Sequence, residues 1–353
     1  MGDISLEELQ LATRNHGMPL EALRYDVTPV GLHYLLIHYD IPAVDPQSWT
    51  LTVRGTVQNS LELTLDELRA RPAVEMTVTM ECAGNGRARF DPRPVSQPWL
   101  SEAIGTARWR GVSLPSLLAE AAPLPGATEV VFSGLDRGIE KEIEQHFRRS
   151  LPLTETTDAL LAYEMNGAPL LPQHGFPLRL VVPGWYGMTN VKWLDTIDVV
   201  VQPFEGFQQA TAYHFRHDED DDGRPLTRMA PRALMVPPGI PEFFTRARTV
   251  SLGDVELEGR AWSGHAPIAG VEVSDDGGES WADTELGEDG GRWAWRSWSY
   301  VWRPQAAGEY VLSCRARDEA GNVQPVDAPW NVGGYSNNSV QRVSVAVTAR
   351  DLL

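Results

Sequence analysis

The fold of this chain is decided by the stretch VEMTVTMECAGNGR, residues 74–87. Its first half, Val74–Met80, is rich in β-branched residues and predicts a buried strand. Gly84 and Gly86 follow closely and indicate that the strand ends in a tight turn. Cys82 therefore lies where a strand gives way to a loop, and we expect it on the exposed rim of a sheet.

Short helices and strands alternate around this stretch. Three helices are predicted from their N-terminal caps, which are Ser5 with Glu8 three residues later, Thr64 before a DEL run, and Ser113 before LPSLLAEAA. Strands are predicted at 50–57, 128–134, 178–184 and 191–202, and an extended segment at 32–46. This mixture predicts an α+β domain.

The pattern changes after a proline-rich boundary between residues 225 and 245, so we divide the chain into domains 1–225 and 226–353. The second part alternates with period two, and Asp276-Gly277 indicates a hairpin. About seven short strands with regular turns are typical of an all-β, immunoglobulin-like sandwich. Six tryptophans lie between Trp262 and Trp302 and are expected in a core or an interface. Cys314 is expected to be a buried small apolar residue.

Composition excludes several classes of protein. The 353 residues carry 48 acidic and 30 basic side chains, a net charge of −18, which argues against binding to nucleic acid or to an anionic membrane. Two distant cysteines make neither a disulfide framework nor a CxxCH haem site. No signal peptide or membrane span is recognisable, so we expect a cytoplasmic protein. Five consecutive carboxylates at 218–222 predict a solvated loop rather than a metal site.

Cys82 is the first candidate for chemistry. Arg87 and Arg89 follow it, and cationic neighbours favour the thiolate, the form that attacks or ligates a metal. No histidine stands beside it in the sequence to act as a base. Three interpretations remain: a metal ligand, a Cys–His arrangement built across the fold, or a structural cysteine.

A second dense segment runs from Ala162 to Trp193. It carries basic and polar side chains around glycine-containing turns, namely His174, Arg179, Tyr186, Asn190 and Lys192. Cations at strand ends, with free backbone N–H groups in the turns, indicate a phosphate or anion site. The alternative is a set of surface charges beside a buried strand.

Taken together, the motifs resemble the sulfite oxidase family of molybdenum enzymes, from about residue 35 to the C-terminus. They occur in family order: ECAGNGR, GTARWRGV, LLAYEMNG, HGFPLRLVVPG, NVKWL, AWSG and a final PWN-GG-SNN-QRV. The resemblance implies an α+β domain that binds one molybdopterin, followed by an immunoglobulin-like domain that forms a homodimer. The implied chemistry is oxygen-atom transfer to or from a small oxyanion, which the cofactor performs.

The resemblance also implies roles for individual residues. Cys82 matches the cysteine that ligates molybdenum, a soft thiolate suited to that site. Arg87 matches an active-site arginine, and Trp99 and Tyr213 match residues of the substrate pocket. The positions that match residues near the pterin and its phosphate are His38, Asp136, His174, Arg179, Asn190 and Lys192.

Two expected substrate arginines are replaced, by Leu36 and by Gly333. Each charge-assisted hydrogen bond is worth ~1.5–3 kcal/mol, so losing two weakens dianion binding by about two to four powers of ten. Arg89, Arg110 or His214 are the candidates for compensation.

Three functions follow from these observations. The first is oxidation of sulfite to sulfate. The second is the same cofactor acting on a less charged substrate such as a sulfoxide, which Leu36 and Gly333 motivate. The third, a non-enzymatic binding protein, rests only on the tryptophan-rich strands. The chain offers no haem domain, so we expect electrons to pass to a separate acceptor, a cytochrome or oxygen.

Overall fold

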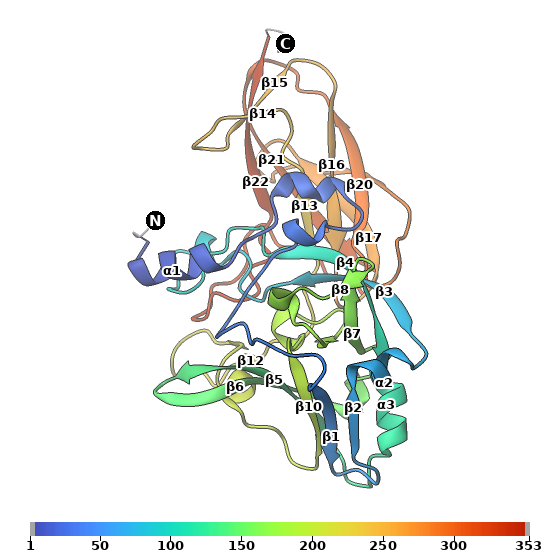
Figure 1. Cartoon of the computed structure of the whole chain (residues 1–353). Helices are drawn as coiled ribbons and strands as arrows, with labels where there is room; N and C mark the ends of the chain where they lie inside the picture. The colour runs from blue at the N-terminus through green and yellow to red at the C-terminus, as the bar shows by residue number, and fades with distance from the viewer. Residues whose placement is uncertain (1–3, 350–353) are drawn as a thin grey trace.

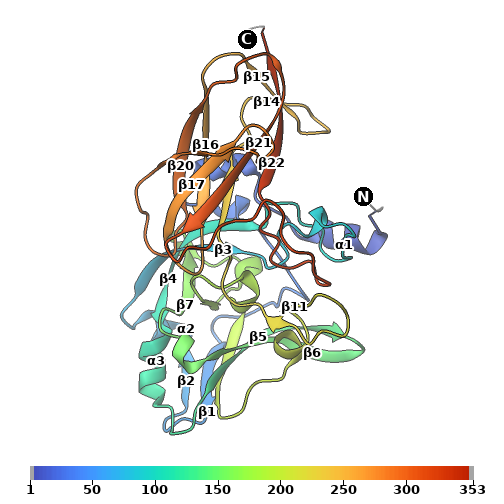
Figure 2. The ribbon, with the colours of Figure 1, turned by 180° about the vertical axis from the view of Figure 1, so that it is seen from behind.

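A computed structural model describes residues 4–349 of the chain. Strands dominate it, and they form two regions that lie one above the other in Figure 1. Residues 50–200 build the sheets of the lower region, and residues 232–348 build those of the upper region. The view from behind shows the same division (Figure 2).

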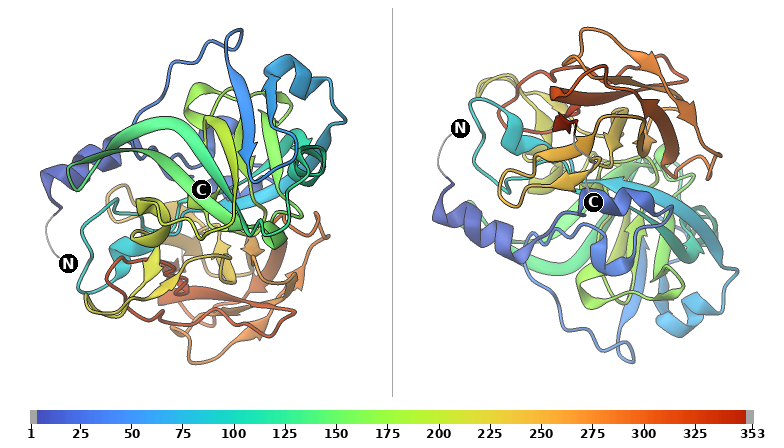
Figure 3. Two further views of the ribbon diagram at one scale, coloured as in Figure 1. Left: turned by 90° about the horizontal axis from the view of Figure 1, so that it is seen from below. Right: turned by 90° about the horizontal axis from the view of Figure 1, so that it is seen from above.

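The lower region contains a five-stranded sheet in the order β2-β1-β10-β5-β6, in which β1 and β10 are parallel and the other neighbours antiparallel. The strands are β1 (Thr50–Gly55), β2 (Leu61–Thr64), β5 (Glu129–Glu140), β6 (Ile143–Pro152) and β10 (Leu194–Val200). The long β5–β6 ribbon extends toward α1 at one side of the molecule (Figure 3).

A second sheet runs through the middle of the molecule and leads to Cys82. Its order is β3-β4-β7-β8, with β9 paired to β7. The strands are β3 (Val74–Glu81), β4 (Ile104–Ser113), β7 (Leu160–Met165), β8 (Ala168–Pro169) and β9 (Arg179–Val181). The predicted strand at 74–80 is therefore confirmed, and Cys82 follows its last residue. A small ribbon of β11 (His214–Phe215) and β12 (Arg224–Pro225) lies beside the first sheet.

The upper region is a pair of sheets around one apolar core. The first, in the order β13-β16-β20-β19, contains β13 (Arg232–Met235), β16 (Val255–Trp262), β19 (Glu285–Leu286) and β20 (Arg296–Trp302). The second, in the order β14-β15-β22-β21-β17-β18, contains β14 (Ile240–Pro241), β15 (Arg248–Ser251), β17 (Ile268–Ser274), β18 (Ala282–Asp283), β21 (Gly308–Asp318) and β22 (Gln341–Thr348).

Specific predictions for the upper region hold. β17 and β18 form the predicted hairpin, with Asp276 in its loop. Four of the six tryptophans, Trp262, Trp295, Trp298 and Trp302, are buried, and so is Cys314.

The helices are α1 (Leu6–Arg14), α2 (Leu65–Arg69), α3 (Leu114–Ala121) and α4 (Phe207–Ala210). Ser5 and Thr64 each form the predicted capping box. Ser113 is the N-cap of α3, as predicted, although its side chain accepts no capping hydrogen bond. Pro115 occupies the second helical position and has no N–H to donate. None of the helices within residues 4–349 is long and apolar enough to cross a membrane.

Single 3₁₀ turns connect many of these elements: η1 (Leu20–Arg24), η2 (Val30–Leu32), η3 (Arg87–Arg89), η4 (Leu153–Glu155), η5 (Pro172–His174) and η6 (Gly187–Thr189). η1 lies against the upper region, where Arg260 donates to the carbonyl oxygens of Leu23 and Arg24. The segment predicted to be extended, 32–46, forms no strand and only an isolated bridge between His16 and Leu35.

Candidate active site

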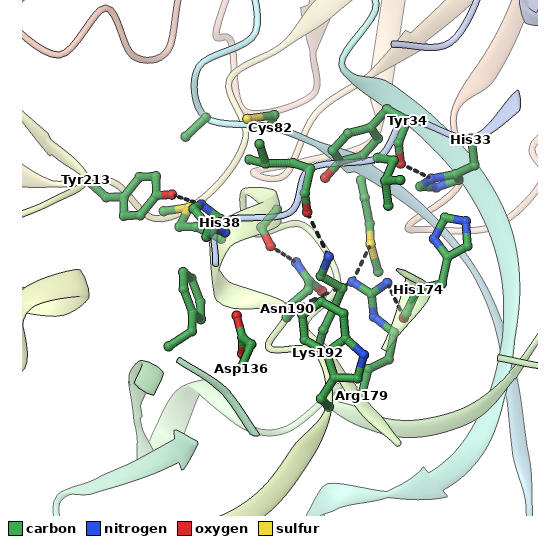
Figure 4. Close-up of a pocket in the computed structure, with 18 residues that line it drawn as sticks. His33, Tyr34, His38, Cys82, Asp136, His174, Arg179, Asn190, Lys192 and Tyr213 are labelled. Atoms are coloured by element: carbon green, nitrogen blue, oxygen red, sulfur yellow. Dashed lines mark hydrogen bonds between the residues drawn. The ribbon is translucent and has the colours of Figure 1, made fainter. Parts of the chain in front are cut away.

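A cavity opens beside the end of β3, and we call it the central pocket (Figure 4). Five separate parts of the chain line it. These are residues 33–36 with His38, then Met80, Cys82 and Ala83, then Asp136 and Phe147, then His174, Arg179, Gly187, Met188, Asn190, Lys192 and Trp193, and finally Tyr213. The two segments that the sequence singled out, around Cys82 and at 162–193, therefore meet at one cavity.

Cys82 is buried, with 6% of its surface exposed, so the prediction that it lies on an exposed rim is wrong. The C-terminal segment covers the loop that follows it. Ser336 donates from its backbone N–H to the carbonyl oxygen of Ala83 at 2.7 Å, and the Asn337 side chain donates to the carbonyl oxygen of Gly86 at 2.9 Å. Gly86 has a φ of 91°, and a Cβ there would come within 2.7 Å of the Asn337 carbonyl oxygen.

The electrostatic prediction for Cys82 holds only in part. Burial raises the pKa of the thiol, which outweighs the lowering effect of Arg87 and of the Trp99 indole N–H. Arg89 does not act on the thiol, because it lines a separate groove with Arg248 and Arg342. A bound cation would have to supply the charge that holds Cys82 as a thiolate.

Two cations line the central pocket and donate only to neutral acceptors. Arg179 donates to the carbonyl oxygens of His174 at 3.1 Å and Asn190 at 3.3 Å, and its buried Nε has no partner. Lys192 donates from Nζ to the carbonyl oxygen of Leu36 at 2.7 Å and to that of Gln173 at 3.3 Å. The pocket thus carries positive charge within a chain whose net charge is −18.

Burial dominates the ionisation of the other polar groups. It raises the pKa of Asp136 and lowers the pKa of Lys192, whose charge Arg179 further disfavours. It also lowers the pKa of His33 to about 4 and that of His38 to about 3. The histidines are therefore neutral near pH 7, and Arg179 keeps its charge, since burial lowers its pKa only to about 10.

Tyr213 joins the pocket to an aromatic cluster. Its hydroxyl lies 2.5 Å from Nε2 of His38, whose ring stacks on Phe147 at 4.7 Å between ring centres. Its own ring lies 5.3 Å from that of Tyr335. Burial raises the pKa of Tyr213 well above its usual range, so the hydroxyl stays protonated and can donate. The backbone of Tyr213 has a φ of 55°, in the left-handed region.

A second cavity shares Tyr213 with the central pocket, and we call it the outer pocket. Its lining includes Tyr213, His214, Arg216, Gly333 and Tyr335. Tyr213 is therefore shared by both pockets. The Arg216 guanidinium and the His214 imidazole give the outer pocket a basic wall.

A buried polar network anchors the end of β3. Both oxygens of the Glu81 carboxylate are used: Oε1 accepts from Arg232 at 2.8 Å and from Asn85 at 2.9 Å, and Oε2 accepts from the Trp262 indole at 2.9 Å. Arg232 and Trp262 belong to β13 and β16 of the upper region. The residue before Cys82 is thus fixed by the second domain.

The structure brings most of the predicted site residues together. Eight of the ten line the central pocket: His38, Cys82, Asp136, His174, Arg179, Asn190, Lys192 and Tyr213. Arg87 and Trp99 are buried close to Cys82 but do not line the pocket. The Asn190 side chain is also engaged by the backbone, since its Oδ1 accepts from the Val182 N–H at 2.7 Å.

The predicted compensating cations are placed differently. Arg110 points to solvent and faces Glu164 at 3.9 Å, and Arg89 lies in the separate groove, so neither lines the central pocket. His214 lines only the outer pocket. In the part of the chain from 4 to 349, the acidic run forms no cluster of three metal-ligating side chains.

Several residues of the site were missed from the sequence. His33, Tyr34 and Phe147 line the central pocket, and Arg149 and Tyr335 contact Tyr213. Arg149 could have been recognised from the sequence. It shares the inward face of its strand with Phe147, and a charged residue at an inward position requires a partner.

Comparison with known proteins agrees with this arrangement. A family model described as the oxidoreductase molybdopterin binding domain matches residues 38–208, and one described as the Mo-co oxidoreductase dimerisation domain matches residues 240–348. Sulfite oxidase from Gallus gallus is 38% identical over 338 residues, which cover 90% of this chain and 72% of that protein. The chain belongs to the sulfite oxidase family. The resemblance in the sequence is thereby confirmed.

Other relatives and one solved structure extend the comparison. Mitochondrial sulfite oxidase from Rattus norvegicus is 36% identical across 91% of this chain, but the chain spans only 62% of that protein. Plant nitrate reductases match as well, at 32% identity for the Hordeum vulgare protein. The sulfane dehydrogenase SoxCD from Paracoccus pantotrophus superposes with a TM-score of 0.81 at 25% identity, covering 97% of this chain and 90% of that one.

Proposed function

We propose that this protein oxidises sulfite to sulfate by molybdenum-dependent oxygen-atom transfer and passes the electrons to a separate acceptor, a cytochrome or oxygen. Each turnover joins one oxygen of water to sulfite and releases two protons and two electrons. The observation that carries the proposal is the position of Cys82, a lone thiol at one wall of a pocket lined by unpaired cations.

The central pocket fits a molybdopterin. Arg179 has an orphaned buried Nε, and neither it nor Lys192 has a carboxylate partner within residues 4–349 that neutralises it at hydrogen-bond distance. A phosphate would supply that missing negative charge. The Cys82 thiol is the soft ligand that a sulfur-rich molybdenum site requires. When bound, this group supplies the oxygen-atom transfer and accepts two electrons.

Each predicted site residue has a defined part in the proposal. Cys82 would ligate the metal, while Arg179, Lys192 and His174 would hold the phosphate and His38, Asp136 and Asn190 the pterin. Tyr213 would donate its hydroxyl proton in a hydrogen bond to the substrate oxyanion. Arg87 would stabilise negative charge at the thiolate and the substrate from behind the pocket wall, and Trp99 would support Cys82 from behind the same wall.

A neutral substrate such as a sulfoxide was the alternative that Leu36 and Gly333 suggested. Relatives that are 34–38% identical over about nine tenths of the chain are named sulfite oxidase, which supports sulfite instead. Because nitrate reductases are among the relatives, turnover of nitrate should be measured beside turnover of sulfite.

The architecture supports three further parts of the proposal. The domain boundary would fall at residues 225 and 226, between β12 and β13. The sandwich would be immunoglobulin-like and would form a homodimer, as its match to a dimerisation domain suggests. The cytoplasmic compartment and the absence of haem stay predictions.

The test is sulfite-dependent reduction of ferricyanide by molybdenum-loaded protein. Saturation in the micromolar range of sulfite, with no comparable turnover of nitrate or dimethyl sulfoxide, is the expected result. Turnover of dimethyl sulfoxide or nitrate that exceeds turnover of sulfite would overturn the proposal.

A further inference from the structure

Arg149 is a buried cation without an acidic partner. It lies on β6, two residues after Phe147, and only 2% of its surface is exposed. Its guanidinium donates from Nη1 to the carbonyl oxygen of Gln208, and its buried Nε has no partner. Within the described residues no carboxylate acts on its charge, and its electrostatic neighbours are the hydroxyls of Tyr213 and Tyr335.

A buried charge of this kind is costly unless something pairs with it. Burial lowers the pKa of Arg149 to about 10, so the guanidinium remains charged near pH 7. Arg232 shows the usual solution, because it is equally buried but meets Glu81 at 2.8 Å. Arg149 has no such counter-charge in the chain itself, so the negative group that completes it must come from outside the chain.

The surroundings of Arg149 indicate where that group binds. Its guanidinium carbon lies 5.7 Å from the ring centre of Tyr213, and Tyr213 lies 5.3 Å from Tyr335. Arg87 faces the same pair from the Tyr335 side, at 4.9 Å from that ring centre. Two guanidinium groups therefore flank the two tyrosines. Tyr213 lines both the central pocket and the outer pocket, and the charges of Arg149 and Arg87 both act on its hydroxyl, so an anion bound there lies close to both charges.

We propose that Arg149 is a positioning residue for the anionic substrate, which acts through Tyr213 and replaces the positive charge missing at Leu36 and Gly333. The inference rests on the proposed function, in which the substrate is an oxyanion. The guanidinium holds the Tyr213 ring and adds positive potential at the hydroxyl. Because Arg149 and Tyr213 are both buried, this potential acts over several ångströms with little screening. A neutral substrate gains nothing from it.

The test uses Arg149→Gln in the molybdenum-loaded enzyme, with Arg148→Gln as the matched control. Arg148 is the preceding residue of β6, its side chain is 41% exposed, and it stacks on Phe204 instead. We expect Arg149→Gln to raise KM for sulfite and Kd for sulfate, measured by calorimetry, about 10- to 100-fold. We expect kcat to change less than threefold, inhibition by neutral dimethyl sulfoxide to stay unchanged, and Arg148→Gln to behave as wild type.

Several results would overturn the inference. One is an unchanged Kd for sulfate in folded Arg149→Gln, and another is an equal loss of affinity for sulfate and dimethyl sulfoxide, which would indicate a structural role. If Arg149→Gln does not fold, Arg149→Lys is used instead, because it keeps the positive charge. We expect Arg149→Lys to bind sulfate with nearly the wild-type affinity. A loss of sulfate affinity of 10-fold or more in folded Arg149→Lys overturns the inference. Sulfate binding that depends on Arg149, without sulfite turnover in the wild type, would refute only the proposed function.

Discussion

Arg87 donates a hydrogen bond from Nε to the carbonyl oxygen of Gly333, at 2.9 Å. The arginine that matches the family's active-site residue is thus held by the C-terminal segment, and its guanidinium faces Tyr335 instead of lining the central pocket. A Cβ at position 333 would come within 2.3 Å of the Tyr335 ring. The glycine and the placement of Arg87 therefore belong to one arrangement, in which Tyr335 occupies the space of a longer side chain.

Replacing Cys82 by serine should abolish turnover without unfolding the protein. A change beside a metal ligand already costs 10- to 100-fold in affinity or activity, so removing the ligand atom should lower sulfite-dependent ferricyanide reduction by more than about 100-fold. Circular dichroism should show an unchanged spectrum. Cys314→Ala, in the core of the upper region, is the control and should retain molybdenum and turnover. An active Cys82→Ser enzyme would contradict the proposed ligand.

Replacing Tyr213 by phenylalanine removes the hydroxyl that lies 2.5 Å from His38. We expect kcat/KM for sulfite to fall about 10- to 100-fold, since a hydrogen bond to a charged group contributes ~1.5–3 kcal/mol. Steady-state kinetics measure the effect. The control is Tyr310→Phe, which removes a hydroxyl that donates to the Ala306 carbonyl oxygen in the upper region. Equal kinetics in both variants would remove Tyr213 from the mechanism.

Introducing arginine at Leu36 should strengthen anion binding. Leu36 lines the central pocket, and only its backbone carbonyl is used, by Lys192. We expect Leu36→Arg to lower KM for sulfite by at least about 10-fold, the effect of one charge-assisted hydrogen bond. Leu9→Arg, on the exposed side of α1, controls for added charge elsewhere. A KM that does not change would show that the chain already supplies enough positive charge.

Breaking the buried pair of Glu81 and Arg232 should destabilise the whole protein. Arg232→Met leaves the Glu81 carboxylate buried without its cation, and such losses cost about 3–5 kcal/mol. Urea unfolding gives the change in the free energy of unfolding. Arg303→Met breaks the exposed pair with Asp254 and should cost at most about 1 kcal/mol. Comparable small losses in both variants would mean that the buried pair does not hold the domains together.

The buried histidines should make stability depend on pH. Unfolded histidine ionises near 6.5, while burial lowers the pKa of His33 to about 4. Between these values the unfolded chain binds a proton that the folded chain does not, so stability is lost as pH falls from 6.5 toward 4. Asp136, whose pKa is raised, acts in the opposite direction. His33 and His38 together outweigh that single carboxyl group.

Urea unfolding of the metal-free protein at pH 6.5 and pH 5 measures this dependence. His33 alone should account for about 2 kcal/mol of the difference in the free energy of unfolding between the two pH values. This follows because each pH unit below the unfolded pKa costs about 1.36 kcal/mol. His33→Gln should reduce the difference by that amount, and His217→Gln, at an exposed position, should leave it unchanged. A wild-type free energy of unfolding that is the same at both pH values would show that His33 is not kept neutral by burial.

Local patterns in the sequence predict much of the fold. Capping boxes place α1 and α2, and period-two alternation predicts the strands of the upper region, because both depend on residues a few positions apart. Strand β3 and its turn follow from β-branched residues and glycines in the same way. Ser113 likewise begins α3 as predicted, whereas the segment 32–46, predicted to be extended, forms no strand.

The site was predicted less completely, since its parts come together over long distances in the sequence. Cys82 was expected to be exposed because nothing near it shows that Ser336 and Asn337 cover its loop. Arg149 was overlooked because alternation shows which way it points but not that Tyr213 lies opposite. Charge alone also misled us about Arg110, which faces solvent.

The anchoring of Glu81 by Arg232 and Trp262 has a consequence for how such a protein can evolve. The strand that delivers the reactive thiol ends in a carboxylate whose partners are encoded some 150 and 180 residues downstream, at 232 and 262. A recombined gene that inherited only the first domain would carry the thiol but lose the groups that hold its strand in place. We therefore expect the two domains to be inherited as one unit, because the sandwich holds the strand that carries the thiol of the cavity.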